Sequence, residues 1–243
     1  MKMLIGSCII VGLMLLDNIG ELLLNQEDIS IAYLFFNTEV YPAGLWGRYL
    51  TPIIIVAFCK NNSLFLEEPN SCSNDKIRVC MFKFTVSAFY GGICLSLSRI
   101  FFILIMSLFF PFIGTRDVWA NLQVWPYFSY SIDGKSFVHI IFIVYYAILS
   151  GSLWGGISAT ITAFTQNERT ALAIPFVLKI SWIQSCRLFN ISSNMRFDYW
   201  LTMTATIDTY LTTTLSSGLC TVVSLILLFW LTYSKVRKDG CNA

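Results

Sequence analysis

The sequence predicts an all-α, polytopic membrane protein: a single transmembrane domain over residues 1–243, with six transmembrane helices and both termini in the cytoplasm. Hydrophobic residues make up 56% of the chain and charged residues only 12%, whereas a soluble domain carries about 25% charged residues. Six apolar segments recur along the chain, most of them near the ~20 residues that cross a bilayer. Lys and Arg are concentrated in alternate connections, which is the charge asymmetry of an inserted protein.

The first predicted span covers residues 3–20 and begins directly after Lys2. It imitates a signal peptide, but no small-residue cleavage site follows it, so we expect a retained helix. The second span covers residues 40–59, where Tyr41 and Trp46 are placed to anchor the helix at the membrane interface.

The third and fourth spans, residues 84–112 and 137–164, are long enough to cross the bilayer with tilt. In the fourth, Gly151, Gly155 and Ala159 recur at every fourth position and therefore share one face of the helix. Small residues at this spacing let two helix backbones approach closely. We expect this face to be a helix-packing surface.

The fifth and sixth spans cover residues 170–189 and 209–233. Only the polar stretch at residues 165–169 separates the fourth span from the fifth, which predicts a tight hairpin between antiparallel neighbours. With the N-terminus inside, the inner segments hold nine Lys and Arg and the outer ones hold three. The inner bases are Lys2, Lys60, Lys76, Arg78, Lys83, Arg169, Lys235, Arg237 and Lys238. This bias places both termini in the cytoplasm.

Two outer connections carry apolar and aromatic residues. The connection at residues 21–39 suits a short amphipathic helix lying in the membrane interface. The connection at residues 113–136 is rich in Trp, Tyr and Phe. Two interpretations of it stay open: an aromatic belt at the membrane surface, or a re-entrant or extracellular gate helix.

Four basic residues fall within or at the ends of the apolar segments, and Arg99 and Lys179 are the ones we single out. A charge at mid-depth costs about 2.5–3.5 kcal/mol, so it normally faces protein or water. For Arg99, which the span boundaries make the most central, we weigh snorkelling to the interface against lining a cavity or a subunit interface. Lys179 follows Pro175 by one helical turn, which predicts a kinked helix open to water.

Motifs for catalysis and for cofactor binding are absent from the sequence. It has no Walker phosphate loop, no GxSxG and no HExxH. The single histidine, His139, cannot build a metal site alone, and the eight cysteines include no CxxC pair. No Asp or Glu lies in mid-span, which disfavours a proton- or sodium-coupled carrier. The sequence therefore predicts no enzyme, and no metal or cofactor on this chain.

The connection at residues 60–83 mixes charges of both signs. Apolar residues lie on both sides of its acidic pair, and Pro69-Asn70 interrupts the helical pattern. This predicts two short amphipathic pieces on the membrane surface. They form either an interfacial loop without a partner or a docking segment for a cytoplasmic protein.

Three motifs together match one known family. The first reads Pro52-Ile53-Ile54-Ile55, Phe65-Leu66-Glu67-Glu68, Lys76-Ile77-Arg78, Lys83 and Gly91-Gly92. The second reads Gly151 to Gly156, Asn167-Glu168-Arg169 and Ala171-Leu172-Ala173-Ile174-Pro175-Phe176. The third is the basic tail Lys235-Val236-Arg237-Lys238-Asp239. With these motifs the chain resembles the permease subunits of type-2 ABC exporters of Gram-positive bacteria.

The resemblance implies a multi-pass export permease of the plasma membrane that works as a homo- or heterodimer. ATP and Mg²⁺ would be bound by a separate cytoplasmic ATPase, and nucleic acid is not an expected partner. The implied ATPase-docking residues are Glu67, Glu68, Lys76, Arg78, Glu168 and Arg169. Aromatic outer connections favour an amphipathic or peptide-like substrate. Two alternatives without ATPase coupling stay open: an accessory or substrate-capture subunit, and a secondary carrier.

Overall fold

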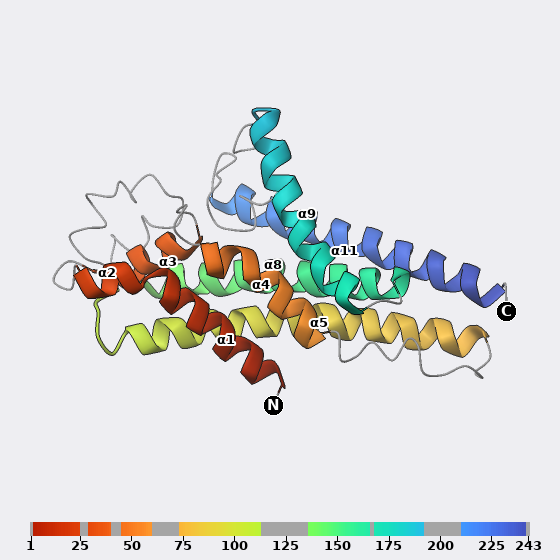
Figure 1. Ribbon diagram of the computed structural model, residues 1–243, viewed down its shortest axis with the longest axis horizontal. Helices are drawn as coiled ribbons and strands as arrows, with labels where there is room; N and C mark the ends of the chain where they lie inside the picture. The colour runs from red at the N-terminus through yellow and green to blue at the C-terminus, as the bar shows by residue number, and fades with distance from the viewer. Residues whose placement is uncertain are drawn as a thin grey trace.

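The computed structural model describes residues 2–24, 29–39, 45–59, 73–112, 136–165, 168–191 and 210–241, and this part of the chain contains helices and short connections but no strand. The helices are α1 (Lys2–Asp17), α2 (Ile19–Leu24), α3 (Ile31–Glu39), α4 (Leu45–Cys59), α5 (Ser73–Met106), α8 (Ser136–Phe164), α9 (Glu168–Leu188) and α11 (Tyr210–Cys241), labelled in Figure 1. The predicted all-α class is confirmed for these residues.

Three long helices, α5, α8 and α11, lie side by side and form the body of the molecule (Figure 1). α8 runs antiparallel to α5. The hydroxyl group of Ser87 on α5 donates to the carbonyl group of Gly155, whereas Gly91, one turn further along α5, faces Gly151, one turn earlier on α8. α5 and α8 therefore form an antiparallel pair along most of their length.

α11 runs parallel to α8. The hydroxyl group of Tyr145 donates to the carbonyl group of Thr214 at 3.0 Å, and further along both helices Thr232 donates to Thr160 at 3.0 Å. Segments of all three helices are long and apolar enough to cross a membrane: Ile77–Met106, Phe137–Phe164 and Leu211–Lys238. They correspond to the third, fourth and sixth predicted spans, and they indicate a multi-pass membrane protein.

The two ends of this bundle differ in character (Figure 1). The start of α5 and the ends of α8 and α11 form one end, which we call the basic end because Arg78, Lys83, Lys235, Arg237 and Lys238 lie there. The opposite end contains α2, α3 and residues 107–112, and we call it the cap end.

α1 and α4 flank only the half of α5 that adjoins the cap end. The hydroxyl group of Ser7 on α1 donates to the carbonyl group of Cys94, midway along α5, at 2.9 Å. Gly6 lies against Phe58 near the end of α4, so α4 ends at the level where α1 begins. With 16 and 15 residues, α1 and α4 measure about 24 and 22 Å. The first two predicted spans thus correspond to helices shorter than the ~30 Å hydrocarbon core.

α1 ends at a turn around Asn18, before the predicted end of the first span at residue 20. The side-chain amide of Asn18 donates to the carbonyl group of Met14 and to the hydroxyl group of Thr38, both at 2.8 Å. Its backbone N–H donates to the carbonyl group of Leu15 at 3.1 Å, the tighter spacing of a 3₁₀ turn. This turn redirects the chain into α2 and ties α1 to α3.

α3 is fixed in the cap end through its first turn. Ser30 caps the helix, its hydroxyl oxygen accepting a backbone N–H at 3.0 Å. The N–H of Ile31 donates to the carbonyl group of Pro111, just beyond α5, at 3.0 Å. A short helix within residues 21–39 is thus present, and Leu34 and its neighbours are buried in the core of the molecule.

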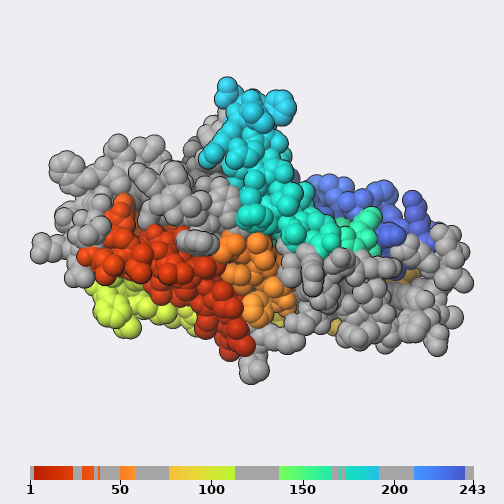
Figure 2. Space-filling model, in the orientation of Figure 1, coloured from red at the N-terminus to blue at the C-terminus, as the bar shows by residue number. Residues whose placement is uncertain are grey.

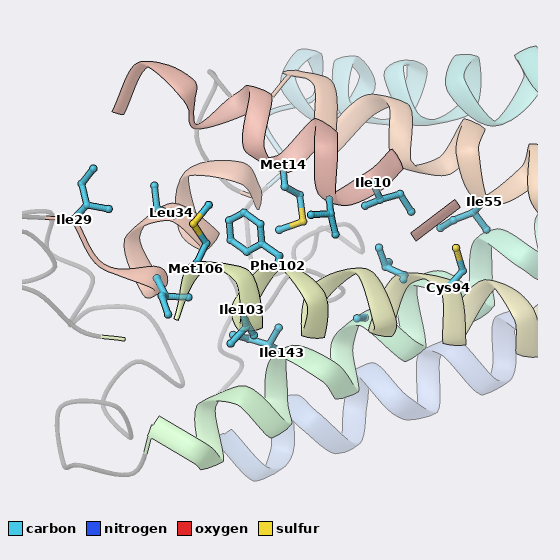
Figure 3. Packing of buried hydrophobic residues seen from close by; sticks show 14 residues of the cluster. Ile10, Met14, Ile29, Leu34, Ile55, Cys94, Phe102, Ile103, Met106 and Ile143 are labelled. Carbon is cyan, nitrogen blue, oxygen red and sulfur yellow. The ribbon is translucent and has the colours of Figure 1, made fainter. Parts of the chain in front are cut away.

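The largest hydrophobic cluster fills the half of the molecule next to the cap end (Figure 3). Phe102 of α5 is fully buried in this cluster, and Met14 of α1 and Leu34 of α3 lie close to it. Ile143 of α8 lies near the same part of α5, whereas Ile55 of α4 lies further along α5, beside Cys94. The short helices are therefore held by packing against the long ones. In lipid, where the hydrophobic effect no longer drives helices together, van der Waals packing of this kind stabilises a bundle.

α9 leaves the bundle at a steep angle from the basic end and protrudes from the surface (Figures 1 and 2). It contacts α4 and α8 and contains Pro175. Asn190 ends it in a left-handed conformation with φ of 47°, and the N–H of Ile191 donates to the carbonyl group of Cys186 at 3.0 Å. This is a Schellman ending. α9 corresponds to the fifth predicted span, residues 170–189.

The boundaries of α5 differ from the prediction. The sequence predicts a span over residues 84–112, but the helix extends from Ser73 to Met106. Residues 73–83, expected as part of the inner connection, are therefore the first turns of α5, and the proposed second amphipathic piece is not separate from it. Residues 60–72 and 113–135 lie outside the described residues.

Candidate functional site

α11 carries an exposed apolar stripe whose length matches the thickness of a membrane. Its large apolar side chains are Leu211, Leu215, Leu219, Val222, Val223, Ile226, Leu227, Trp230 and Leu231. At about 1.5 Å per residue, the stripe is about 30 Å long. A hydrocarbon core has the same thickness, ~30 Å. Only 11% of the apolar stretch of α11 is buried within the molecule, so this helix lies at the edge of the bundle and its apolar surface is open to lipid.

Basic residues lie just beyond this stripe at the basic end. The rings of Phe84 and Phe229 meet edge to face with centroids 5.4 Å apart, which sets the register of α5 against α11. From that contact, at about 1.5 Å per residue, Arg78 and Lys235 lie about 9 Å and Arg237 about 12 Å toward the basic end. α11 remains helical through this basic tail, beyond the predicted end of the sixth span. Bases from two helices thus share one level.

α8 ends and α9 begins at the basic end. Residues 166 and 167, at the centre of the predicted tight hairpin between them, lie outside the described residues. Among the residues expected to dock an ATPase, Arg78 is exposed at this end. Lys76, Glu168 and Arg169 belong to the first turns of α5 and α9, and their side chains lie outside the described part of the structure. Two further residues of the expected set lie outside the described residues altogether: Glu67 and Glu68.

α5 and α8 approach until their backbones touch. A Cβ atom added at Gly151 would lie 2.8 Å from the carbonyl carbon of Gly91, and one at Gly155 would overlap the carbonyl oxygen of Ser87. The structure therefore places Gly151 and Gly155 directly against α5. Ala159, which follows at the same spacing, is 4% exposed. Only glycine fits at the two closest positions, because any side chain would push the helices apart.

Hydroxyl groups join α8 to α11. Thr232 is fully buried and donates to Thr160 at 3.0 Å, while Tyr145 donates to the carbonyl group of Thr214 at 3.0 Å. Interhelical hydrogen bonds of this kind hold helices together within lipid. We did not expect this seam from the sequence. On α11, Thr213, Ser217 and Thr221 repeat at every fourth position and are each 1% exposed. Of these three, Ser217 reaches α8, since its hydroxyl group donates to that of Tyr146 at 3.4 Å.

Arg99 is buried, 7% exposed, where α1, α3 and α5 meet. Its guanidinium lies over the ring of Phe35 at 5.0 Å from the centroid and approaches the sulfur of Met14 at 3.0 Å. Measured from Phe84 along α5, Arg99 lies about 22 Å toward the cap end. At this distance along the bundle Arg99 lies level with the part of the α11 stripe nearest the cap end, close to Leu215 and Leu211. It contacts protein on α1 and α3 instead of snorkelling into solvent.

Lys179 lies on α9 with its ammonium group over the ring of Trp154 of α8, 5.9 Å from the centroid. The side chain is partly exposed. An aromatic face stabilises a cation by about 0.5–1 kcal/mol at an exposed site and by more where water is excluded. The contact ties the protruding helix to the bundle one turn after Pro175.

No group of three or more His, Cys, Asp and Glu that could hold a metal ion occurs among the described residues. His139 packs edge-on against Phe112, with ring centroids 5.6 Å apart, and is 8% exposed. Comparison of the chain with protein-family models, with curated proteins and with solved structures found no match.

Proposed function

We propose that this chain is the membrane-spanning permease subunit of an ATP-driven exporter of the type-2 ABC kind, powered by a separate ATPase subunit. One observation carries the proposal: the start of α5, the α8–α9 connection and the tail of α11 come together at the basic end of a bundle of long apolar helices. The first two are the segments to which the sequence resemblance assigns ATPase contact. A soluble ATPase below the membrane would meet both at once.

The proposal puts the basic end in the cytoplasm, because Lys and Arg favour that side of a membrane. It requires α1, α4 and α9, with flanking residues, to complete six crossings that leave both termini inside. It also requires a second permease copy or a homologue, and an amphipathic or peptide-like substrate.

Glycine contact between α5 and α8 suits this role, since two helices packed backbone to backbone move as one body. A push on the first turns of α5 at the basic end would therefore reach α8 and the core at the cap end. In this proposal the α5–α8 pair transmits closure of the ATPase across the membrane.

Co-purification with the ATPase encoded beside the chain tests the proposal. The double substitution Glu67→Lys/Glu68→Lys is expected to reduce the amount of ATPase recovered. The matched control is Glu27→Lys/Asp28→Lys, which reverses two acids on the predicted outer side and is expected to leave recovery unchanged. Equal recovery with both variants would remove the inner connection from the docking surface.

Topology is tested with single cysteines in a cysteine-free chain. Lys238→Cys at the basic end is expected to react with a membrane-impermeant maleimide only after the cells are opened, and Phe109→Cys at the cap end in intact cells. Vanadate-sensitive transport by reconstituted vesicles separates a permease from an accessory subunit. Transport that persists without any ATPase would favour a secondary carrier instead.

A further inference from the structure

The lipid-facing stripes of two helices end in bases at the basic end. On α11, Arg237 and Lys238 follow the exposed side chains of Trp230 and Leu231 by two helical turns, so each base continues the face that the apolar residue occupies. On α5, the exposed Arg78 stands one turn before the exposed Phe82 on the same face. These bases therefore point outward, around the bundle, rather than into it.

The bases of α5 and α11 lie at one depth. The Phe84–Phe229 contact aligns the two helices. From it, Arg78 lies about 9 Å, Arg237 about 12 Å and Lys238 about 14 Å toward the basic end. The apolar stripe stops at Leu231, only about 3 Å past the contact. Relative to the level of Leu231, Arg78, Arg237 and Lys238 lie about 6, 9 and 11 Å further out. A bilayer with ~30 Å of hydrocarbon and a total thickness of about 40–45 Å has a headgroup layer of about 5–8 Å on each side. Arg78 therefore lies within this layer, and Arg237 and Lys238 lie just beyond it, with long side chains that can extend back toward it.

The charge at this level is strongly positive. In residues 73–83 and 235–241 the sequence has six bases against two acids, Asp75 and Asp239. Partner proteins of a permease would approach the end of the bundle, where the α8–α9 connection lies. Arg78, Arg237 and Lys238 instead lie on the same helix faces as the exposed apolar side chains. Because those side chains would contact acyl chains, the molecules next to the three bases would be lipids of the surrounding bilayer.

We propose that Arg78, Arg237 and Lys238 form a belt that binds the phosphate headgroups of anionic phospholipids. In this arrangement the acyl chains lie along the exposed stripes of α5 and α11. Phe82 and Trp230 contact the part of each acyl chain that is nearest the headgroup. Each base near a membrane surface attracts anionic lipid by about 1 kcal/mol, a factor of about five in local enrichment. The belt is independent of which function the bundle performs.

The test uses the fluorescence of Trp230 in the full chain, with the other six tryptophans replaced by Phe. The protein is reconstituted in phosphatidylcholine vesicles containing phosphatidylglycerol, with either one or the other lipid brominated on its acyl chains. Quenching by bromine reports which lipid is next to Trp230. We expect phosphatidylglycerol to be enriched about five-fold or more over phosphatidylcholine at low salt, and this preference to fall in 1 M NaCl, where charges are screened within about 3 Å.

The triple variant Arg78→Gln/Arg237→Gln/Lys238→Gln is expected to reduce the preference to below about two-fold. The matched control is Arg187→Gln, an exposed base on α9 away from the belt, which is expected to keep it. If the tryptophan replacements prevent folding, mass spectrometry of lipids retained by the unaltered chain and by the triple variant measures the same preference. Equal quenching by both lipids, or a preference that survives in the triple variant, overturns the proposal. Loss of ATPase recovery with lipid preference intact would assign these bases to a protein partner instead.

Discussion

A methyl group added at Gly151 is expected to destabilise the protein through the α5–α8 contact. The new Cβ atom would lie 2.8 Å from the carbonyl carbon of Gly91, whereas ordinary van der Waals contact is 3.4–4 Å. The three nearest atoms, in Gly91 and Gly92, all belong to the backbone of α5, so the strain cannot be relieved by a side-chain rotation. The helices must separate by about half an ångström or more, which weakens the dispersion contacts on both sides of the site.

Two opposing terms set the magnitude. Overpacking of a tight interface costs about 1–3 kcal/mol, while replacing Gly by Ala within a helix is favourable by about 0.5–1 kcal/mol. We therefore expect Gly151→Ala to lower the free energy of unfolding by about 1–2 kcal/mol. The control is Gly12→Ala on α1, where a Cβ atom would meet nothing within 4 Å. That substitution is expected to be neutral or stabilising by up to about 1 kcal/mol.

The assay is unfolding in mixed micelles at increasing mole fraction of SDS, followed by far-ultraviolet circular dichroism. The difference between the two alanine variants removes the helix-propensity term and leaves the contact, about 1–3 kcal/mol. If Gly151→Ala unfolds at the same SDS fraction as Gly12→Ala, the backbones of α5 and α8 do not touch at this site, and the transmission role proposed for this pair loses its basis.

Three further substitutions test other contacts. Phe35→Leu is expected to lower the free energy of unfolding by about 1–2 kcal/mol, since it removes the ring that stacks on the Arg99 guanidinium. A double-mutant cycle with Arg99→Met should show a coupling energy of about 1 kcal/mol. A coupling energy of zero would mean that the ring acts only by packing. Thr232→Val is expected to lower the free energy of unfolding by about 0.5–1.5 kcal/mol through the lost hydrogen bond to Thr160. The double variant with Thr160→Val should lose less than the sum of the two single variants. Strict additivity would mean that the two hydroxyl groups are not in contact. Asn190→Val is expected to lower the midpoint of thermal unfolding, because φ is 47° at this position and a β-branched residue is strained there. Asn190→Gly should leave the midpoint unchanged or raise it. Equal midpoints for the two variants would mean that the left-handed ending of α9 is absent.

The extent of α8 and α9 was predictable from the sequence, whereas α5 and α11 extend beyond their predicted spans at the basic end. Residues 137–164 and 170–189 correspond closely to α8 and α9, because polar connections bound an apolar run on each side. The start of α5 was wrong by about three turns. Hydropathy marks where a chain enters hydrocarbon, and a helix can continue past that point when its side chains are charged and solvated. The first turns of α5 carry such a side chain in Arg78, which is exposed.

The site was predictable only in part. The glycine spacing in the fourth span pointed to a packing face, but nothing local identified α5 as its neighbour. The third span was placed too late at both ends, since α5 extends from Ser73 to Met106. The partners of the Arg99 guanidinium were not predictable, because they come from α1 and α3, far away in sequence. The hydroxyl repeat on α11 is visible in the sequence, but no pattern marks Tyr146 as the partner of Ser217, or Tyr145 and Thr160 as the partners of Thr214 and Thr232.

The amino-acid sequence by itself determined that this protein is helical and that it belongs in a membrane. It also determined that Lys and Arg are concentrated in every second connection between the apolar segments. Each of these depends on how single residues partition between water and hydrocarbon, a local property. Only the tertiary structure decided which helices touch, that α1 and α4 cover half of the bundle, and that the base-bearing turns of α5 and α11 share one level. Lipid is as apolar as the side chains it surrounds, so hydrophobicity does not choose among helix faces. The choice falls to shape and hydrogen bonding between residues distant in the chain, such as Gly91 with Gly151 and Thr160 with Thr232.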